Sequence, residues 1–163
     1  TIALEEVRLL AHTMHPRVLD DLGLVAAVRR LARETTGEQT RVDVIARESI
    51  DEAIPAASAS MFYRVAQEAI RNACRPAASE HIEIHISADA DNARLEITDD
   101  GIGFDPGAAA HRHTGIGLFT MRERVALLEG ELHVPSRVGG GTSVLATVPL
   151  RNTDAGLPTG FFE

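Results

Sequence analysis

The sequence has a single cysteine, Cys74, no tryptophan, and an aromatic content of only 4% in 163 residues. One cysteine excludes an internal disulfide and any zinc site built from several cysteines, and it favours a reducing compartment. The chain also lacks an apolar run near the ~18 residues that a membrane-spanning helix needs. We therefore expect a cytoplasmic location and no direct insertion of this chain into a membrane, although a longer parent protein could still be anchored in one.

Basic residues are in the minority, with 16 Lys and Arg against 24 Asp and Glu, which gives a formal net charge of -8. This balance argues against nucleic acid or an anionic membrane as the main partner. The hydrophobic fraction of 44% and the charged fraction of 25% are typical of a soluble globular protein. A chain of this length can bury a core of its own without disulfides or metals.

Glycine is distributed unevenly along the chain. Nine of the 13 glycines lie between Gly101 and Gly141. Glycines concentrate where the backbone turns sharply or comes close to a ligand, so this quarter of the chain is the first place to look for a site.

Hydrophobic periodicity predicts four helices and five strands. The helices are expected over residues 2–14, about 22–35, 57–74 and 117–129, and the strands over residues 41–46, 81–86, 94–98, 131–135 and 142–148. Asp20 or Asp21 is the expected cap of the second helix, and Gly37 lies beyond its end. Residues 47–55 and 99–117 are expected to be loops. This order of elements predicts an α+β fold, with helices on one face of a mixed sheet.

Two features of the glycine-rich region suit a nucleotide. The segment Gly115-Ile116-Gly117 opens a helix, where free N–H groups and the helix dipole favour phosphate. Asp99 is a poor neighbour for phosphates, but its carboxylate can accept a hydrogen bond from the amine of adenine, which the O6 atom of guanine cannot donate. We therefore expect Asp99 at the base end of a nucleotide.

Glu68 and Asn72 are four residues apart on the third predicted helix and so share one face. Asn72 offers a neutral oxygen that suits Mg²⁺, which usually keeps waters and substrate phosphates in its shell. Glu68 is a candidate general base or a residue that orients the reacting groups.

Four ordered segments resemble motifs of the ATP-binding domain of sensor histidine kinases, in the branch that includes the nitrate/nitrite sensors and the DesK-like kinases. They are residues 62–73 (FYRVAQEAIRNA, the N box), 99–106 (DDGIGFDP, G1), 115–125 (GIGLFTMRERV, G2) and 139–142 (GGGT, G3). Residues 15–24 are similar to the segment that links the dimerisation helices to this domain in that branch. The resemblance spans about residues 14–150.

This resemblance implies a Bergerat ATP-binding fold, a two-layer α/β sandwich that binds Mg²⁺ and ATP. Asp99 would contact adenine, with Thr142 supporting that contact through water, and Asn72 would hold Mg²⁺. The residues implied in nucleotide binding are Asp99, Gly101, Gly103, Gly115, Gly117, Leu118, Thr142 and Arg75, and the implied catalytic residues are Glu68 and Asn72. Residues 104–114 would form a lid over ATP. Pro76 departs from the family, which usually has His after the basic residue at position 75.

The resemblance also implies the organisation of the chain and its partners. Residues 1–15 would end a dimerisation helix, 16–150 would form the ATP-binding catalytic domain, and 151–163 a C-terminal tail. The γ-phosphoryl group of ATP would pass to a histidine and then to a response regulator, and the parent kinase would be a homodimer. The expected phosphoacceptor histidine, followed by an acidic residue, has no counterpart in this sequence.

The histidines that are present have simpler interpretations. We interpret His12 and His15 as surface or helix-end residues, and the alternative for either is that it accepts phosphate. We interpret His81 and His85 as members of a solvated strand face rather than a metal site. His111 and His113, with Arg112, lie in the expected lid and are either solvated or close to phosphates.

Two other functions remain open on these residues. The first is an ATPase or an anti-sigma serine kinase of the same superfamily, in which Glu68 would activate water or a serine hydroxyl. The second is a non-catalytic module that senses nucleotides or binds proteins.

Overall fold

The computed structural model describes residues 15–75, 77–109 and 115–150. The helix expected over residues 2–14, which includes His12, and the C-terminal tail lie outside the described residues. So do Pro76 and the expected lid residues 110–114, among them His111, Arg112 and His113.

A five-stranded mixed sheet forms one layer of the molecule, with the strand order β1-β2-β3-β5-β4. Strand β1 pairs with β2 in parallel, and all other neighbours are antiparallel. The strands are β1 Arg41–Ala46, β2 His81–Ala88, β3 Asn92–Asp99, β4 Glu131–His133 and β5 Thr142–Pro149. A parallel pair needs a long crossover connection, which the residues between β1 and β2 supply.

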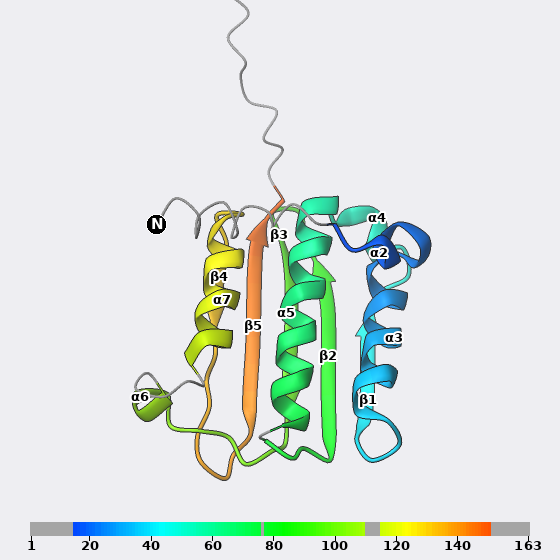
Figure 1. Ribbon diagram of the computed structural model, residues 1–163. Helices are drawn as coiled ribbons and strands as arrows, with labels where there is room; N and C mark the ends of the chain where they lie inside the picture. Colours follow the sequence, from blue (N-terminus) through cyan, green and yellow to red (C-terminus); the bar gives the residue numbers. More distant parts are fainter. Residues whose placement is uncertain (1–14, 76, 110–114, 151–163) are drawn as a thin grey trace, which may run out of the picture.

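Helices form the second layer, and the longer ones lie across one face of the sheet (Figure 1). They are α2 Arg17–Leu22, α3 Leu24–Thr36, α4 Ile50–Ala53, α5 Ala56–Cys74, α6 Pro106–Ala109 and α7 Gly115–Ala126. The expected two-layer α+β sandwich, with helices on one face of a mixed sheet, is thereby confirmed. Within the described ranges, no helix has both the length and the apolar character that crossing a bilayer requires.

The core lies between the two layers and follows from the two hydrophobic periods. Helix α5 directs every third or fourth residue at the sheet, and Phe62, Val65 and Ile70 on it are fully buried. The central strands alternate, so that Ile82 and Ile84 of β2 are buried while their neighbours in sequence are half-exposed. Met121 and Val125 of α7 close the core on the β4 side.

The region around the second predicted helix differs from expectation. Gly23, with φ of +78°, separates α2 from α3, and neither Asp20 nor Asp21 caps α3 because both lie inside α2. The carboxylate of Asp51 accepts a hydrogen bond from the N–H of Val25 in the first turn instead, at 3.2 Å. The prediction that Asp20 or Asp21 caps this helix was wrong, because the carboxylate that binds its first turn belongs to Asp51, which is distant in the sequence. Gly37 does end α3, as expected.

Two segments that were expected to be loops contain short helices. Helix α4 lies within residues 47–55, and its Ile50 is buried. Helix α6 begins at Pro106, whose fixed φ suits the first turn of a helix. Strand β4 is shorter than predicted and ends at His133, after which Ser136 forms an isolated bridge with Thr142.

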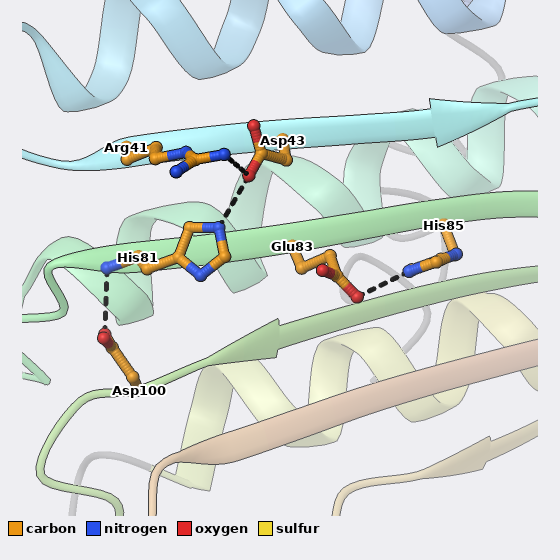
Figure 2. A network of polar contacts seen from close by, with 6 residues as sticks. All are labelled: Arg41, Asp43, His81, Glu83, His85 and Asp100. Atoms are coloured by element: carbon orange, nitrogen blue, oxygen red, sulfur yellow. Dashed lines mark hydrogen bonds and ion pairs between the residues drawn. The ribbon is translucent and has the colours of Figure 1, made fainter.

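The opposite face of the sheet carries a polar network (Figure 2). Asp43 pairs with Nε2 of His81 at 2.8 Å and with Arg41 at 2.9 Å, and His85 pairs with Glu83 at 2.6 Å. All five side chains are partly exposed, which agrees with a solvated strand face. Among the described residues, no group of three or more His, Cys, Asp or Glu is arranged to hold a metal ion.

Candidate functional site

The predicted site residues gather at one edge of the molecule, the lower edge in Figure 1. Here α5 and β3 end, and β5 and α7 begin. Chain direction explains the convergence, because α5 and β3 run toward this edge while β5 and α7 start from it. Residues separated by up to 74 positions in the sequence, from Glu68 to Thr142, therefore share one region.

Asp99 is the last residue of β3, and one of its carboxylate oxygens is fully engaged. Its Oδ1 accepts a hydrogen bond from the hydroxyl of Ser79 at 3.0 Å and another from the N–H of Gly101 at 2.9 Å. Ser79 is buried, so the contact is held away from water. Oδ2 has no hydrogen-bond partner among the described residues and can therefore accept a hydrogen bond from a ligand.

Asp99 lies opposite Thr142 in the antiparallel pairing of β3 with β5. Ser136 then ties this pair to the neighbouring loop. Its hydroxyl lies 2.8 Å from the hydroxyl of Thr142, and it also contacts the carbonyl of Gly141 and accepts the N–H of Phe104. Asp99, Ser136 and Thr142 line a cavity of about 280 Å³ at the end of the two strands.

The glycines near Asp99 are needed for close approach of backbone segments. A Cβ at Gly103, where φ is +61°, would lie 2.0 Å from the carbonyl oxygen of Arg137. A Cβ at Gly101 would lie 2.5 Å from the carbonyl oxygen of Ala77. The G1 loop therefore packs directly on the G3 loop and on the segment after α5, and no larger residue fits at either position.

The two adjacent aspartates of the G1 segment have different tasks. Asp100 turns away from the cavity, and its Oδ1 accepts the N–H groups of Glu80 and His81, both at 2.9 Å. These contacts fasten the start of β2 beside the end of β3. Asp99, and not Asp100, is thus among the residues that line the cavity.

The C-terminal end of α5 brings Asn72 and Arg75 to the same edge. The carbonyl of Asn72 accepts the N–H of Ala77, and the carbonyl of Ala77 in turn accepts the N–H of Ile102 in the G1 loop. The side chain of Asn72 is half-buried, and Arg75 is exposed at the helix end. Burial raises the pKa of the nearby Cys74 thiol, Arg75 lowers it and Asp99 raises it further, which is consistent with a protonated, unreactive thiol.

Glu68 and Gly117 meet where α5 faces the first turn of α7. A Cβ at Gly117 would lie 2.1 Å from Oε1 of Glu68, so glycine is required for this contact. The other carboxylate oxygen of Glu68 lies 3.4 Å from Nη1 of Arg71. Glu68 and Gly117 both line a second cavity of about 390 Å³ between α5 and α7. Gly115 is the first residue of α7, and the side chain of Leu118 packs against the core.

The predicted site residues thus form two neighbouring groups. One surrounds Asp99 and contains Gly101, Gly103 and Thr142, and the other joins Glu68 to Gly117. Sequence reasoning missed Ser79 and Ser136, which hold the first group in place. Neither serine belongs to a recognisable motif, and only the pairing of distant segments reveals its role.

His15 is held more firmly than a surface histidine. Its Nδ1 contacts the hydroxyl of Ser60 on α5, and its Nε2 lies 3.0 Å from Oδ1 of Asp20. Both ring nitrogens are therefore engaged within the domain. This arrangement fastens the residue that precedes Pro16 to α5 and α2.

Comparisons with known proteins agree with this arrangement. Residues 57–152, more than half of the chain, match the family described as histidine kinase-, DNA gyrase B-, and HSP90-like ATPase. The chain is 37% identical over 153 residues to the sensor histidine kinase MctS of Rhizobium johnstonii, covering 90% of this chain and 32% of that protein. It is 35% identical over 139 residues to the signal transduction histidine-protein kinase/phosphatase DegS of Bacillus subtilis, covering 83% and 36%.

A third relative is the oxygen sensor histidine kinase NreB of Staphylococcus carnosus, 32% identical over 151 residues, with 90% of this chain and 42% of that protein covered. The chain therefore spans between a third and about two fifths of these relatives' length.

Solved structures support the fold. The histidine kinase domain of the blue-light activated histidine kinase from Erythrobacter litoralis EL346 superposes with a TM-score of 0.62 at 24% identity, covering 78% of this chain and 61% of that one. The same kinase in a longer form gives 0.63 at 21% identity, covering 82% and 48%. The motifs, the sheet order and these matches agree, and the chain belongs to the histidine kinase-, DNA gyrase B-, and HSP90-like ATPase family.

Proposed function

We propose that this chain is the ATP-binding catalytic domain of a two-component sensor histidine kinase, which transfers the γ-phosphoryl group of ATP to a histidine that does not belong to this sequence. The observation that carries the proposal is the state of Asp99. One carboxylate oxygen is held by Ser79 and Gly101, the other has no partner among the described residues, and Asp99 and Thr142 line the same cavity.

The donor set at the edge fits ATP. The amine of adenine would donate to Oδ2 of Asp99, and the hydroxyl of Thr142 would bind a water at the base. The close packing of Gly101 and Gly103 keeps the G1 loop thin enough for the base to lie against backbone. Gly115 and Gly117 open α7, and N–H groups in the first turn of a helix have no partner within the helix, which suits the phosphates. Arg75, exposed at the end of α5, can reach the same phosphates.

Magnesium fits the same edge as a companion of the nucleotide. Asn72 contributes one neutral oxygen from the last turn of α5, and Mg²⁺ commonly takes one or two protein oxygens together with waters and substrate phosphates. Bound there, the ion would neutralise charge on the phosphates during transfer. Glu68 contacts Arg71 and the first turn of α7. This arrangement favours a role in orienting the reacting groups rather than a role as general base.

The partners proposed for the parent protein rest on the resemblance to sensor histidine kinases. MctS, DegS and NreB are named as sensor or signal transduction histidine kinases. We propose that the parent acts as a homodimer in the cytoplasm and passes the phosphoryl group to a response regulator. Residues 1–15, 16–150 and 151–163 would be the end of a dimerisation helix, the catalytic domain and a tail.

Measurement of nucleotide binding and hydrolysis by the isolated chain tests the proposal. We expect Mg-ATP to bind and to be hydrolysed slowly, and we expect Asp99→Asn to weaken binding at least tenfold, because the amide turns either a donor or a weaker acceptor toward adenine. Asp91→Asn, in the exposed turn before β3, is the matched control and should bind ATP like the unchanged chain.

Three results would contradict parts of the proposal. Failure to bind Mg-ATP, or equal binding by the Asp99→Asn variant, would favour a non-catalytic module. Brisk hydrolysis that disappears in Glu68→Gln would favour an ATPase. Phosphate that the chain transfers from ATP to a protein acceptor should be labile to acid and stable to alkali, as phosphohistidine is; acid-stable phosphate would favour a serine kinase.

A further inference from the structure

Strand β1 forms one edge of the sheet, and in the part of the chain that the structure describes no strand pairs with its outer side (Figure 1). The N–H of Arg41 donates to the carbonyl of Glu80 at 2.9 Å, so Arg41 directs its backbone groups toward β2. Successive residues of a strand direct these groups to opposite sides. The backbone groups of Val42, Val44 and Ala46 therefore point to the outer side, where a further strand can pair with them.

A groove of about 260 Å³ lies beside this edge, between β1 and helix α3. Ala32 of α3 and Val42 and Val44 of β1 contribute apolar side chains to its lining. Val42 and Val44 are half-exposed, whereas Ile82 and Ile84, their register partners on β2, are fully buried. The apolar layer under the helices is thus incompletely covered at β1.

The charge of this groove is positive. Arg29 and Arg33, one turn apart on α3, belong to its lining, and no carboxylate does. Arg30 between them pairs with Glu34 at 2.7 Å, whereas neither Arg29 nor Arg33 forms an ion pair with a residue that the structure describes. Nη2 of Arg29 donates to the carbonyl of Val44 at 3.5 Å, which is a long and weak hydrogen bond. In a chain with a formal net charge of -8, this edge therefore favours an anionic partner.

We propose that the outer edge of β1 binds an extended acidic segment of a partner protein, which adds a strand to the sheet. The backbone of the segment pairs with the outward groups of Val42, Val44 and Ala46. Every second side chain of the segment then lies over the groove, where carboxylates meet Arg29 and Arg33. A backbone N–H of the segment replaces the weak bond from Arg29 to Val44, and the guanidinium is released for a carboxylate.

A second copy of this chain is a poorer occupant of the same edge. Pairing of two β1 strands about a twofold axis brings Arg29 and Arg33 of one copy close to the same residues of the other. Like charges that meet across an interface oppose binding, and the groove lining has no carboxylate to offset them. Strand β1 carries none of the proposed nucleotide contacts, so this surface is independent of the proposed function.

Titration of the chain with two synthetic peptides tests the surface. One peptide of about eight residues alternates glutamate with threonine, and the other has lysine in place of each glutamate. Binding is measured by calorimetry and by the hydrogen exchange of single amides in NMR spectra. We expect the glutamate peptide to bind saturably and to slow exchange at Val42, Val44 and Ala46. Asp43 and Ile45, whose N–H groups face β2, should keep their exchange rates.

A pair of modified peptides tests the backbone pairing. Each is the glutamate peptide with N-methyl groups on alternate amides, and the two peptides carry them on opposite sets. In one of them the methyl groups face β1 and should abolish binding, because those amides can no longer donate. In the other they face solvent and should leave binding intact.

Variants of the chain test the charge. Arg29→Gln and Arg33→Gln together should weaken binding of the glutamate peptide at least tenfold and leave binding of Mg-ATP unchanged. Arg30→Gln is the matched control, because Arg30 is exposed on the same helix but does not line the groove. Asp99→Asn should also bind the peptide normally, so failure of the proposed function does not decide this test.

Four results would overturn the proposal. They are the absence of saturable binding by the glutamate peptide, equal binding of the lysine peptide, equal binding of the two N-methyl peptides, and a loss in Arg30→Gln as large as in the folded double variant. Protection of Val42, Val44 and Ala46 that rises with protein concentration without any peptide would place a second copy on the edge, and would overturn it too.

Discussion

Asp99 illustrates how a single side chain is prepared for a ligand. Two donors fix one oxygen, which restricts the orientation of the carboxylate and leaves the second oxygen without a partner among the described residues. Sequence alone predicted Asp99 as the adenine acceptor from its chemistry and its motif. It could not reveal Ser79, because nothing at position 79 shows that the end of β3 lies beside it.

Replacement of Ser79 by alanine should weaken ATP binding about fivefold, because one ordinary hydrogen bond contributes about 1 kcal/mol. The loss should appear in affinity more than in fold, since the N–H of Gly101 still holds Oδ1. Calorimetric titration with Mg-ATP measures it, with Ser87→Ala on the exposed face of β2 as control. Equal affinities for Ser79→Ala and the unchanged chain would show that Ser79 does not orient the carboxylate.

The contacts of Asp43, on the open face of the sheet, predict that the stability of the fold depends on pH (Figure 2). Its bond with His81, and then its bond with Arg41, lower the pKa of the carboxyl below the ordinary value of 3.8. The folded state therefore binds this proton at lower pH than the unfolded state does, so the stabilisation is present above the ordinary pKa and is lost as pH falls through the folded pKa.

Urea unfolding of the Asp43→Asn variant between pH 5 and pH 3, as approximate limits, should accordingly show a shallower loss of stability than the unchanged chain. Asp91→Asn should retain the full slope. A steeper slope in Asp43→Asn than in the unchanged chain would contradict the direction of the pKa shift.

At the scale of elements, regular segments were predicted well and their ends poorly. The strand Arg41–Ala46 and the long helix α5 follow from strong local periodicity, so their bounds agree with expectation within a residue. The break at Gly23 and helix α4 could not be predicted from local periodicity. The Asp51 contact and the burial of Ile50 depend on segments that are distant in the sequence. Tertiary contacts decide where such short elements begin and end.

The G3 loop gives a test with a matched pair of glycines. Gly139 and Gly141 both have positive φ, of +77° and +73°, so alanine at either position incurs about 1 to 2 kcal/mol of backbone strain. A Cβ at Gly141 would also lie 2.0 Å from the carbonyl oxygen of Asp99, whereas a Cβ at Gly139 meets nothing within 4 Å.

Gly141→Ala should therefore lower the free energy of unfolding by about 3 kcal/mol or more, and Gly139→Ala by about 1 kcal/mol. Chemical denaturation of the two variants measures the difference. Equal losses would mean that the β5 strand start shifts away from Asp99 without cost.

At the scale of the whole molecule, four motifs predicted the sandwich and its site edge because their order along the chain matches the way helices and strands converge in the fold. The second cavity was not predicted. It is lined by Arg64 and Arg71 of α5 and by Arg124 of α7. These arginines lie in the motifs from which Glu68, Asn72 and the glycines were predicted as site residues. Only the packing of α5 against α7 brings Arg64 and Arg124 together.

We propose that this edge of the sheet recognises adenine through Asp99. Calorimetric binding of Mg-ATP and Mg-GTP to the unchanged chain and to Asp99→Asn tests this recognition. We expect ATP to bind at least tenfold more tightly than GTP, because guanine has a carbonyl where adenine has an amine, and we expect the Asp99→Asn variant to lose this preference. Equal affinities for ATP and GTP in the unchanged chain, or a preference for ATP that survives Asp99→Asn, would contradict it.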